Sequence, residues 1–156
     1  MKDSFDDQIW SRPVNLGDSK EILLWRNDRV SRENFKNQDI VSQKEHQVWL
    51  EKKLNSSSSS LIMFGRDEIK IGIVRLDIEQ EYIDVSINLN PNERGKKLGK
   101  KILKVSERYL NESLKEKKLR AEVLKMNIPS QKVFERVGYK LESTKSNMLI
   151  YIKKLQ

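Results

Sequence analysis

The fold is decided by the stretch Asn90-Pro91-Asn92-Glu93-Arg94-Gly95-Lys96-Lys97-Leu98-Gly99-Lys100. An alternating strand pattern precedes it, and an amphipathic pattern that predicts a helix over residues 96–114 follows it. The first amides of a helix lack internal partners, and the helix dipole adds positive potential there. This order predicts a basic turn that binds a phosphate-rich ligand. The alternative is a solvated helix start that happens to be basic.

Length and composition limit the class of protein. The chain has 156 residues, so residues 1–156 are expected to form a single domain. It has no cysteine, which excludes disulfides and a thiol nucleophile. No apolar run approaches the ~20 residues of a membrane span, and the acidic segment Met1–Asp7 lacks the apolar stretch of a signal peptide. We therefore expect a cytoplasmic protein with no membrane partner.

The net charge of +8 attracts polyanions. The lysines lie mainly on amphipathic helices and near the glycine turn, with little aromatic interleaving, so no nucleic-acid partner is expected. A phosphorylated small molecule or an acidic partner fits this charge equally well. No metal is among the expected ligands.

The hydrophobic patterns predict a mixed α/β domain. Strands are expected over Ile9–Val14, Leu61–Gly65, Ile69–Leu76, Tyr82–Leu89, Leu119–Leu124, Tyr139–Leu141 and Met148–Ile152. Helices are expected over Glu21–Asn27, from the Ser42 cap to Leu54, over 96–114 and over Ser130–Val137, with a loop over Asn55–Ser60. A helix joins the strands that end at Leu89 and start at Leu119, so these two should be parallel and the other pairs antiparallel. Ligands bind at the carboxyl ends of parallel strands, where the basic turn lies.

Two motifs resemble the GNAT superfamily of acetyl-CoA-dependent N-acetyltransferases. The segment Arg94–Gly99 matches the family pattern Arg/Gln-x-x-Gly-x-Gly/Ala, with Lys97 in place of the middle glycine. The second motif runs from Asn127 to Gly138-Tyr139, with Phe134 where many members have a tyrosine that protonates the leaving thiolate. The resemblance covers nearly the whole chain. It implies the GNAT fold: a mixed, mostly antiparallel sheet with one parallel strand pair at the cofactor cleft, flanked by helices.

A narrower resemblance is to acetyltransferases that act on nucleotide-linked amino sugars in pseudaminic- and legionaminic-acid-type pathways of bacterial surface glycans. The residues that carry it are Leu24-Trp25-Arg26-Asn27-Asp28, Phe35, Ser42, Glu45-His46 and Trp49. Ribosomal-protein and antibiotic acetyltransferases of the same superfamily can share Trp-Arg-Asn.

The resemblance implies acetyl-CoA as the cofactor and assigns residues to it. Ile87, Asn88 and Leu89 would line the pantetheine arm, and an amide near Asn88 or Leu89 would stabilise negative charge on the carbonyl oxygen. The pyrophosphate would lie on the turn formed by Arg94, Gly95, Lys96, Lys97, Leu98, Gly99 and Lys100. Asn127 and Ser130 would meet the pantetheine or nucleotide part, although Asn127 is equally expected as an ordinary helix cap.

Three residues are candidates for proton removal from the acceptor amine. Asp84 and Ser86 share one strand face beside the expected cleft, and His46 has a pKa range suited to proton transfer. The alternatives are a polar outer strand face and a structural histidine beside Trp49 and Leu50.

The candidate substrate-binding residues are Arg26, Asn27, Phe35 and His46. Arg26 and Asn27 could bind a diphosphate or carboxylate, because arginine forks to such oxyanions. Phe35 could stack on a sugar or uracil ring. A helix-end salt bridge and simple packing are the alternatives.

The predicted function is direct acetyl transfer to the amine of a small substrate, most simply a nucleotide-linked amino sugar. Acetylation of a protein N-terminus and a non-catalytic acetyl-CoA-binding module are the alternatives. Either a monomer or a homodimer is expected, since Met148–Ile152 could pair across a dimer.

Overall fold

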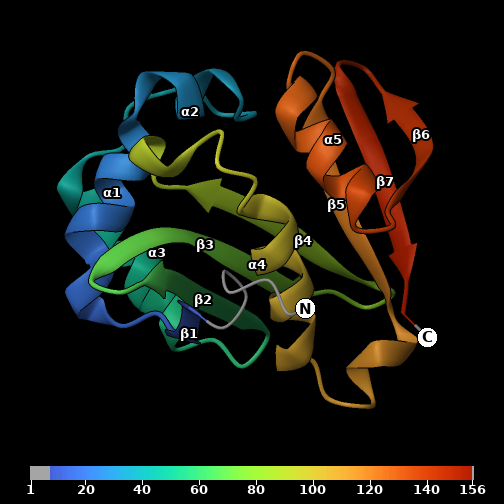
Figure 1. The fold of residues 1–156 in the computed structure, drawn as a ribbon, viewed down its shortest axis with the longest axis horizontal. Helices are drawn as coiled ribbons and strands as arrows, with labels where there is room; N and C mark the ends of the chain where they lie inside the picture. Colours follow the sequence, from blue (N-terminus) through green and yellow to red (C-terminus); the bar gives the residue numbers. More distant parts are fainter. Residues whose placement is uncertain (1–7, 156) are drawn as a thin grey trace.

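A computed structural model of the chain describes residues 8–155, so the predicted character of Met1–Asp7 lies outside the described residues. The strands of this part form one seven-stranded sheet in the order β1-β2-β3-β4-β5-β7-β6 (Figure 1). They are β1 (Ile9–Pro13), β2 (Ser59–Arg66), β3 (Ile69–Ile78), β4 (Tyr82–Leu89), β5 (Lys118–Leu124), β6 (Lys140–Lys145) and β7 (Met148–Lys154). β4 and β5 pair in parallel, and the other neighbouring strands are antiparallel. This confirms the predicted mixed sheet with one parallel pair.

In the described part of the chain, five α-helices flank the sheet: α1 (Ser19–Asn27), α2 (Arg29–Glu33), α3 (Gln43–Leu54), α4 (Gly99–Ser106) and α5 (Ile128–Arg136). Short 3-10 turns occupy Leu16–Asp18, Pro91–Glu93, Glu107–Tyr109 and Leu114–Glu116. Figure 1 shows α4 in front of the sheet and α3 behind it. The predicted start of α3 is confirmed, because Ser42 Oγ accepts a hydrogen bond from the Glu45 amide at 3.1 Å. Within residues 8–155, no helix combines the length and apolar character needed to cross a bilayer.

The helix predicted over residues 96–114 is wrong in length. Lys97 has φ +60°, which lies outside the right-handed helix, so α4 begins only at Gly99. At the other end, Ser106 Oγ donates to the Leu103 carbonyl at 2.6 Å, and the chain then tightens into a 3-10 turn. Asn111 Oδ1 accepts from the Leu114 amide at 3.0 Å, which starts a separate turn.

Two hydrophobic cores lie on opposite faces of the sheet. Alternation along β2 sends Ile62 and Phe64 to the core beneath α4 and α5, and sends Leu61 and Met63 to the core beneath α1 and α3. Along β4, Ile83 and Val85 belong to the α4 side. The intervening Asp84 and Ser86 therefore face the α1 and α3 side.

The antiparallel pairing of the last two strands is confirmed, but the idea that the last strand is a free edge is not. β7 lies between β5 and β6, so the idea that Met148–Ile152 pairs across a dimer is wrong. The edge of the sheet beside β7 is β6, whose six residues are all exposed and whose register shifts between Leu141 and Ser143. The predicted loop over Asn55–Ser60 is also too long, because β2 already begins at Ser59.

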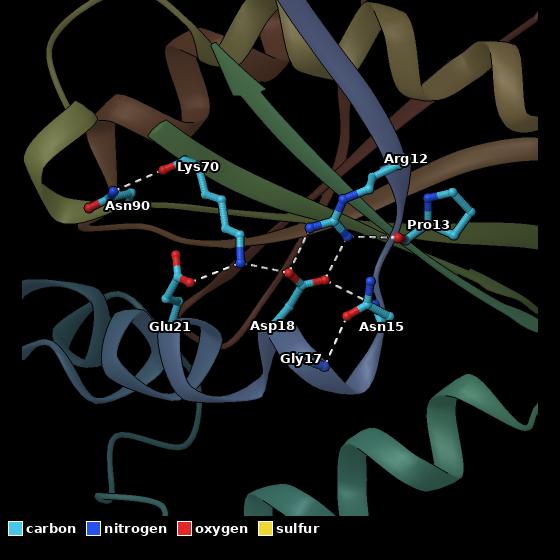
Figure 2. Close-up of polar contacts among 8 residues, drawn as sticks. All are labelled: Arg12, Pro13, Asn15, Gly17, Asp18, Glu21, Lys70 and Asn90. Atoms are coloured by element: carbon cyan, nitrogen blue, oxygen red, sulfur yellow. Dashed lines mark hydrogen bonds and ion pairs between the residues drawn. The ribbon is translucent and has the colours of Figure 1, made fainter. Parts of the chain in front are cut away.

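An ion-pair network centred on the buried Asp18 joins β1 to β3 and to the first residue of the basic turn (Figure 2). Both oxygens of Asp18, which is 1% exposed, accept from the Arg12 guanidinium at 2.7 and 2.8 Å, and Lys70 Nζ lies 2.8 Å from Oδ1. Burial alone would raise the pKa of Asp18, but the hydrogen bonds from Arg12 and Lys70 hold this pKa well below its usual range. The Lys70 carbonyl accepts from Asn90 Nδ2 at 2.9 Å, so the network reaches the first residue of the basic turn.

Candidate active site

The sheet opens at its single parallel pair. Among the residues that the structure describes, β4 and β5 pair only from Tyr82–Asp84 to Lys118–Arg120, and the rest of β4 has only β3 beside it. The Asn90 amide bonds to the Ile71 carbonyl on the β3 side at 2.9 Å. Backbone amides point to alternate sides along a strand, so the Leu89 amide faces the opening. Of the two amides expected to stabilise an oxyanion, Leu89 has the suitable direction.

A cleft of about 550 Å³ lies at this opening, and we call it the strand-gap cleft. The predicted cofactor residues that line it are Ile87, Asn88, Leu89, Arg94, Gly95, Lys97, Leu98, Gly99, Asn127 and Ser130. Within residues 8–155, its lining does not include Lys96 or Lys100. Lys96 Nζ instead pairs with Glu93 Oε2 at 2.8 Å.

The basic turn has the backbone geometry of an anion cradle. Gly95 (φ +76°) and Lys97 (φ +60°) are both left-handed and alternate with ordinary residues. Such alternation turns successive amides toward one point, which suits a phosphate. The left-handed conformation of Lys97 costs about 1 kcal/mol of backbone strain, which glycine at this position would avoid. At Gly99 a Cβ would lie 3.1 Å from Val133 Cγ1, so glycine there permits the close packing of α4 on α5.

Asn127 is both a helix cap and a cleft residue. Its Oδ1 accepts from the Ser130 amide at 3.3 Å, and both residues line the strand-gap cleft.

Phe134, the other motif position that departs from the family pattern, lies in the core. It is 3% exposed, packs edge-on against Tyr139 at 4.9 Å between ring centroids, and is outside the lining of the cleft within the described residues. Phe134 is therefore a core residue.

A second cavity of about 520 Å³ lies between α1, α3 and the sheet, and we call it the α1–α3 cavity. Its lining residues come from α1, the loop after α2, α3, β3 and β4. It shares Phe35, Ile87 and Asn88 with the strand-gap cleft, so the two cavities adjoin at these residues. A group bound in one cavity can therefore meet a group bound in the other beside β4.

Arg26 and His46 both line the α1–α3 cavity. Arg26 Nη2 donates to the Asn37 carbonyl at 2.8 Å, and its guanidinium lies 4.7 Å from the centroid of the Phe35 ring. His46 is 3% exposed, and its Nδ1 lies 3.3 Å from Ser19 Oγ. Burial lowers the pKa of His46, and the charge of Arg26 lowers it further, so the ring is neutral at pH 7.

The charged side chains around the α1–α3 cavity are mostly positive. Arg26, Lys36 and Arg75 line it, against the single carboxylate of Glu45. The aromatic rings of Phe35 and Trp49 lie in the same lining. This combination suits a ligand with an anionic group and a planar or sugar ring.

Asn27 is placed differently from the expectation. Its Nδ2 donates to the Val41 carbonyl and its Oδ1 accepts from the Val41 amide, both at 2.8 Å. Within residues 8–155 it is not part of the lining of the α1–α3 cavity. Asn27 therefore holds the loop before α3 against the end of α1, with both polar atoms of its amide bonded to Val41.

Asp84 and Ser86 separate in the structure. Ser86 lines the α1–α3 cavity, whereas Asp84 is outside the described lining of both cavities. Asp84 lies in register with Asp77 on β3 and with Arg120 on β5. Burial raises the pKa of Asp84, and the charge of Arg75 opposes this rise.

Several lining residues were missed from the sequence. Val30, Ser31 and Asn34 of the α2 region line the strand-gap cleft. The signal for α2 was the spacing from Asp28 to Ser31, since Asp28 Oδ2 accepts from the Ser31 amide at 3.1 Å as a helix cap. Arg75 was visible as a charge directly after the apolar run Ile71–Val74. Within residues 8–155, no group of three histidine or acidic side chains could hold a metal ion.

An open parallel strand pair with a left-handed, glycine-containing turn at its mouth defines a site that suits a phosphate-bearing ligand. The model of the acetyltransferase (GNAT) domain family matches residues 9–140, so the chain belongs to this family and is an acyltransferase that uses acetyl-CoA. Comparison with curated protein sequences gave no match.

Solved structures show the same fold. A domain from Methanocaldococcus jannaschii is 22% identical with a TM-score of 0.83, covering 94% of this chain and 98% of that one. Spermidine N-acetyltransferase from Vibrio cholerae, in complex with CoA and spermine, is 17% identical with a TM-score of 0.80, covering 94% of each chain. The Campylobacter jejuni N-acetyltransferase PseH, in complex with acetyl coenzyme A, is 21% identical with a TM-score of 0.72, covering 95% of this chain and 99% of that one.

Proposed function

We propose that this chain transfers an acetyl group directly from acetyl-CoA to the amine of a nucleotide-linked amino sugar. The observation that carries the proposal is the adjoining of two cavities at β4, one beside an anion-binding turn and one lined by Arg26, Arg75 and aromatic rings. Direct transfer is expected because the chain has no cysteine to form an acyl-enzyme.

The strand-gap cleft fits acetyl-CoA, which supplies a thioester-activated acetyl group. The left-handed turn at Gly95 and Lys97 would hold the pyrophosphate through its amides. Asn127 and Ser130 would meet the pantetheine or nucleotide part from the other wall. The Leu89 amide would donate to the acetyl carbonyl oxygen, where negative charge grows during transfer.

The α1–α3 cavity would bind the acceptor. Buried charge-assisted hydrogen bonds to phosphate are strong, and the Arg26 Nη1 atom is buried with no partner within residues 8–155. Phe35 and Trp49 would contact the sugar or base ring. The same positive lining disfavours a polyamine such as the spermine bound to the Vibrio cholerae enzyme, because like charges repel.

The acceptor amine must lose a proton before or during transfer. A neutral His46 can accept this proton at Nε2 when its Nδ1 carries the hydrogen that Ser19 Oγ accepts. Ser86 lies in the same lining and can relay a proton. Asp84 would act only through Ser86 or water, because it lies outside the described lining of both cavities.

The test is CoA release from acetyl-CoA with four parallel panels: UDP-linked amino sugars, CMP-linked amino sugars, spermidine and basic N-terminal peptides. We expect turnover with a nucleotide sugar alone. Turnover with only spermidine or only a peptide would reject the acceptor assignment and keep the acetyltransferase chemistry. Acetyl-CoA binding without turnover of any amine would favour a non-catalytic binding module.

A further inference from the structure

Arg94 joins the basic turn to the start of α2. Its Nη2 donates to Asp28 Oδ2 at 2.6 Å and to Ser31 Oγ at 2.5 Å. The Arg94 side chain is 33% exposed and that of Asp28 is 27% exposed. The Arg94 guanidinium holds the pKa of Asp28 below its usual range, so this carboxylate is charged at neutral pH.

The segment that Asp28 starts forms a wall shared by the two cavities. Val30, Ser31 and Asn34 line the strand-gap cleft. Phe35, just beyond the end of α2, lines both cavities and stacks with Arg26. A shift of this segment would therefore change the shape of both cavities together.

The Arg94 guanidinium has donors to spare. It carries five N–H groups, and within residues 8–155 its hydrogen bonds to the protein all come from Nη2. Arg94 also lines the strand-gap cleft. It can therefore keep Asp28 on one nitrogen while Nε and Nη1 meet a phosphate oxygen.

We infer that Asp28 is a positioning residue that couples cofactor binding to the acceptor cavity through Arg94. A phosphate on the turn fixes Arg94, Arg94 fixes Asp28 at the start of α2, and α2 fixes Phe35 between the two cavities. Acetyl-CoA and the acceptor then bind with positive cooperativity, and each raises the affinity of the other by the same factor. The inference rests on the proposed function in one respect, that the strand-gap cleft holds the cofactor.

The test uses the full chain, CoA as the ligand, and amide hydrogen exchange. Asp28→Asn removes the charge but keeps a good helix cap, because asparagine caps as well as aspartate. Glu33→Gln is the matched control, since it removes one carboxylate from the same helix, where Glu33 makes only an exposed 3.3 Å pair with Arg29.

We expect saturating CoA to slow amide exchange over residues 29–37 at least fivefold in wild type and in E33Q, within the usual range of about 5–150-fold for coupled sites. In D28N the CoA dissociation constant should stay within threefold of wild type, while this protection is lost. In turnover assays the acceptor KM of D28N should rise at least fivefold with little change in the acetyl-CoA KM.

Wild-type-like protection in CoA-saturated D28N would overturn the inference, because direct contact with the ligand would then explain the ordering. A CoA dissociation constant raised more than tenfold in D28N would also overturn it, by making Asp28 part of the cofactor site itself. Absence of CoA binding to wild type, measured by calorimetry, would remove the proposed function as well, so the two failures are distinguishable.

Discussion

His46 Nε2 and Arg26 Nη1 are buried in the lining of the same cavity, and neither has a hydrogen-bond partner within residues 8–155. Buried polar atoms are nearly always paired, since an unpaired one costs about 1–3 kcal/mol. A ligand that supplies both missing partners would therefore fit this cavity.

Arg26→Gln should weaken acceptor binding and leave cofactor binding intact. A hydrogen bond to a charged group contributes about 1.5–3 kcal/mol, which corresponds to an increase in acceptor KM of about 10- to 150-fold. The acetyl-CoA KM should change less than twofold, because Arg26 lines only the α1–α3 cavity. Steady-state kinetics with both substrates varied measures this. Arg29→Gln, an 85%-exposed arginine, is the control, and equal effects of the two variants would contradict the assignment.

His46 should make the protein less stable as the pH falls. Its pKa is lowered in the folded chain, so the unfolded chain binds more protons below the unfolded value of 6.5. The free energy of unfolding should therefore decrease from pH 7.5 to pH 5, and His46→Gln should remove part of this decrease. Asp84 acts in the opposite sense, because its raised pKa favours the folded chain as the pH falls toward 4.

Urea titrations at pH 5, 6 and 7.5 measure this dependence. The same pH slope in wild type and H46Q would show that His46 is not the group responsible.

Asp18→Asn should destabilise the protein by about 3 kcal/mol. Removing one partner from a buried ion pair leaves charge uncompensated. Here Arg12 loses its carboxylate partner, and Lys70 keeps only that of Glu21. Glu33→Gln should change stability by less than about 0.5 kcal/mol, because its pair with Arg29 is exposed. Urea unfolding of both variants gives the comparison, and similar losses would contradict the role of the network.

Lys97 allows strain and charge to be separated. Lys97→Asn removes the charge while asparagine tolerates φ +60°, and Lys97→Gly also removes the strain. If Lys97 contacts the pyrophosphate, both variants should weaken acetyl-CoA binding several-fold and reduce its dependence on salt. Calorimetry at two ionic strengths measures this. Lys100→Asn is the control, since Lys100 lies outside the described lining of the cleft, and unchanged affinity in the Lys97 variants would place that side chain in solvent.

Most of the fold could be predicted because it follows from local patterns. Alternation in β4, the cap at Ser42 and the helical crossover to β5 are each encoded within a few residues. The length of α4 could not be predicted in this way. The apolar periodicity continues past Ser106, whereas the backbone changes there from an α-helix to a 3-10 turn. The strand order around β7 also depends on pairing between segments far apart in the chain.

The cofactor side of the site was easier to predict than the acceptor side. Its residues form two short motifs, around Arg94 and around Asn127, so spacing alone brings most of them together. The α1–α3 cavity instead combines Arg26, His46 and Arg75 from three separate elements. The spacing of residues in the sequence does not show that these three side chains line one cavity. It also does not show that the Asn27 amide bonds to Val41 in the loop before α3.

The exposed edge of β6 has a consequence for behaviour at high concentration. An open strand edge is a template on which further chains can stack into cross-β fibrils. This edge presents Lys140, Glu142 and Lys145 to solvent and is kinked by the register shift after Leu141. An incoming strand would have to follow that kink and bury those charges. Both features therefore disfavour aggregation through the edge of β6.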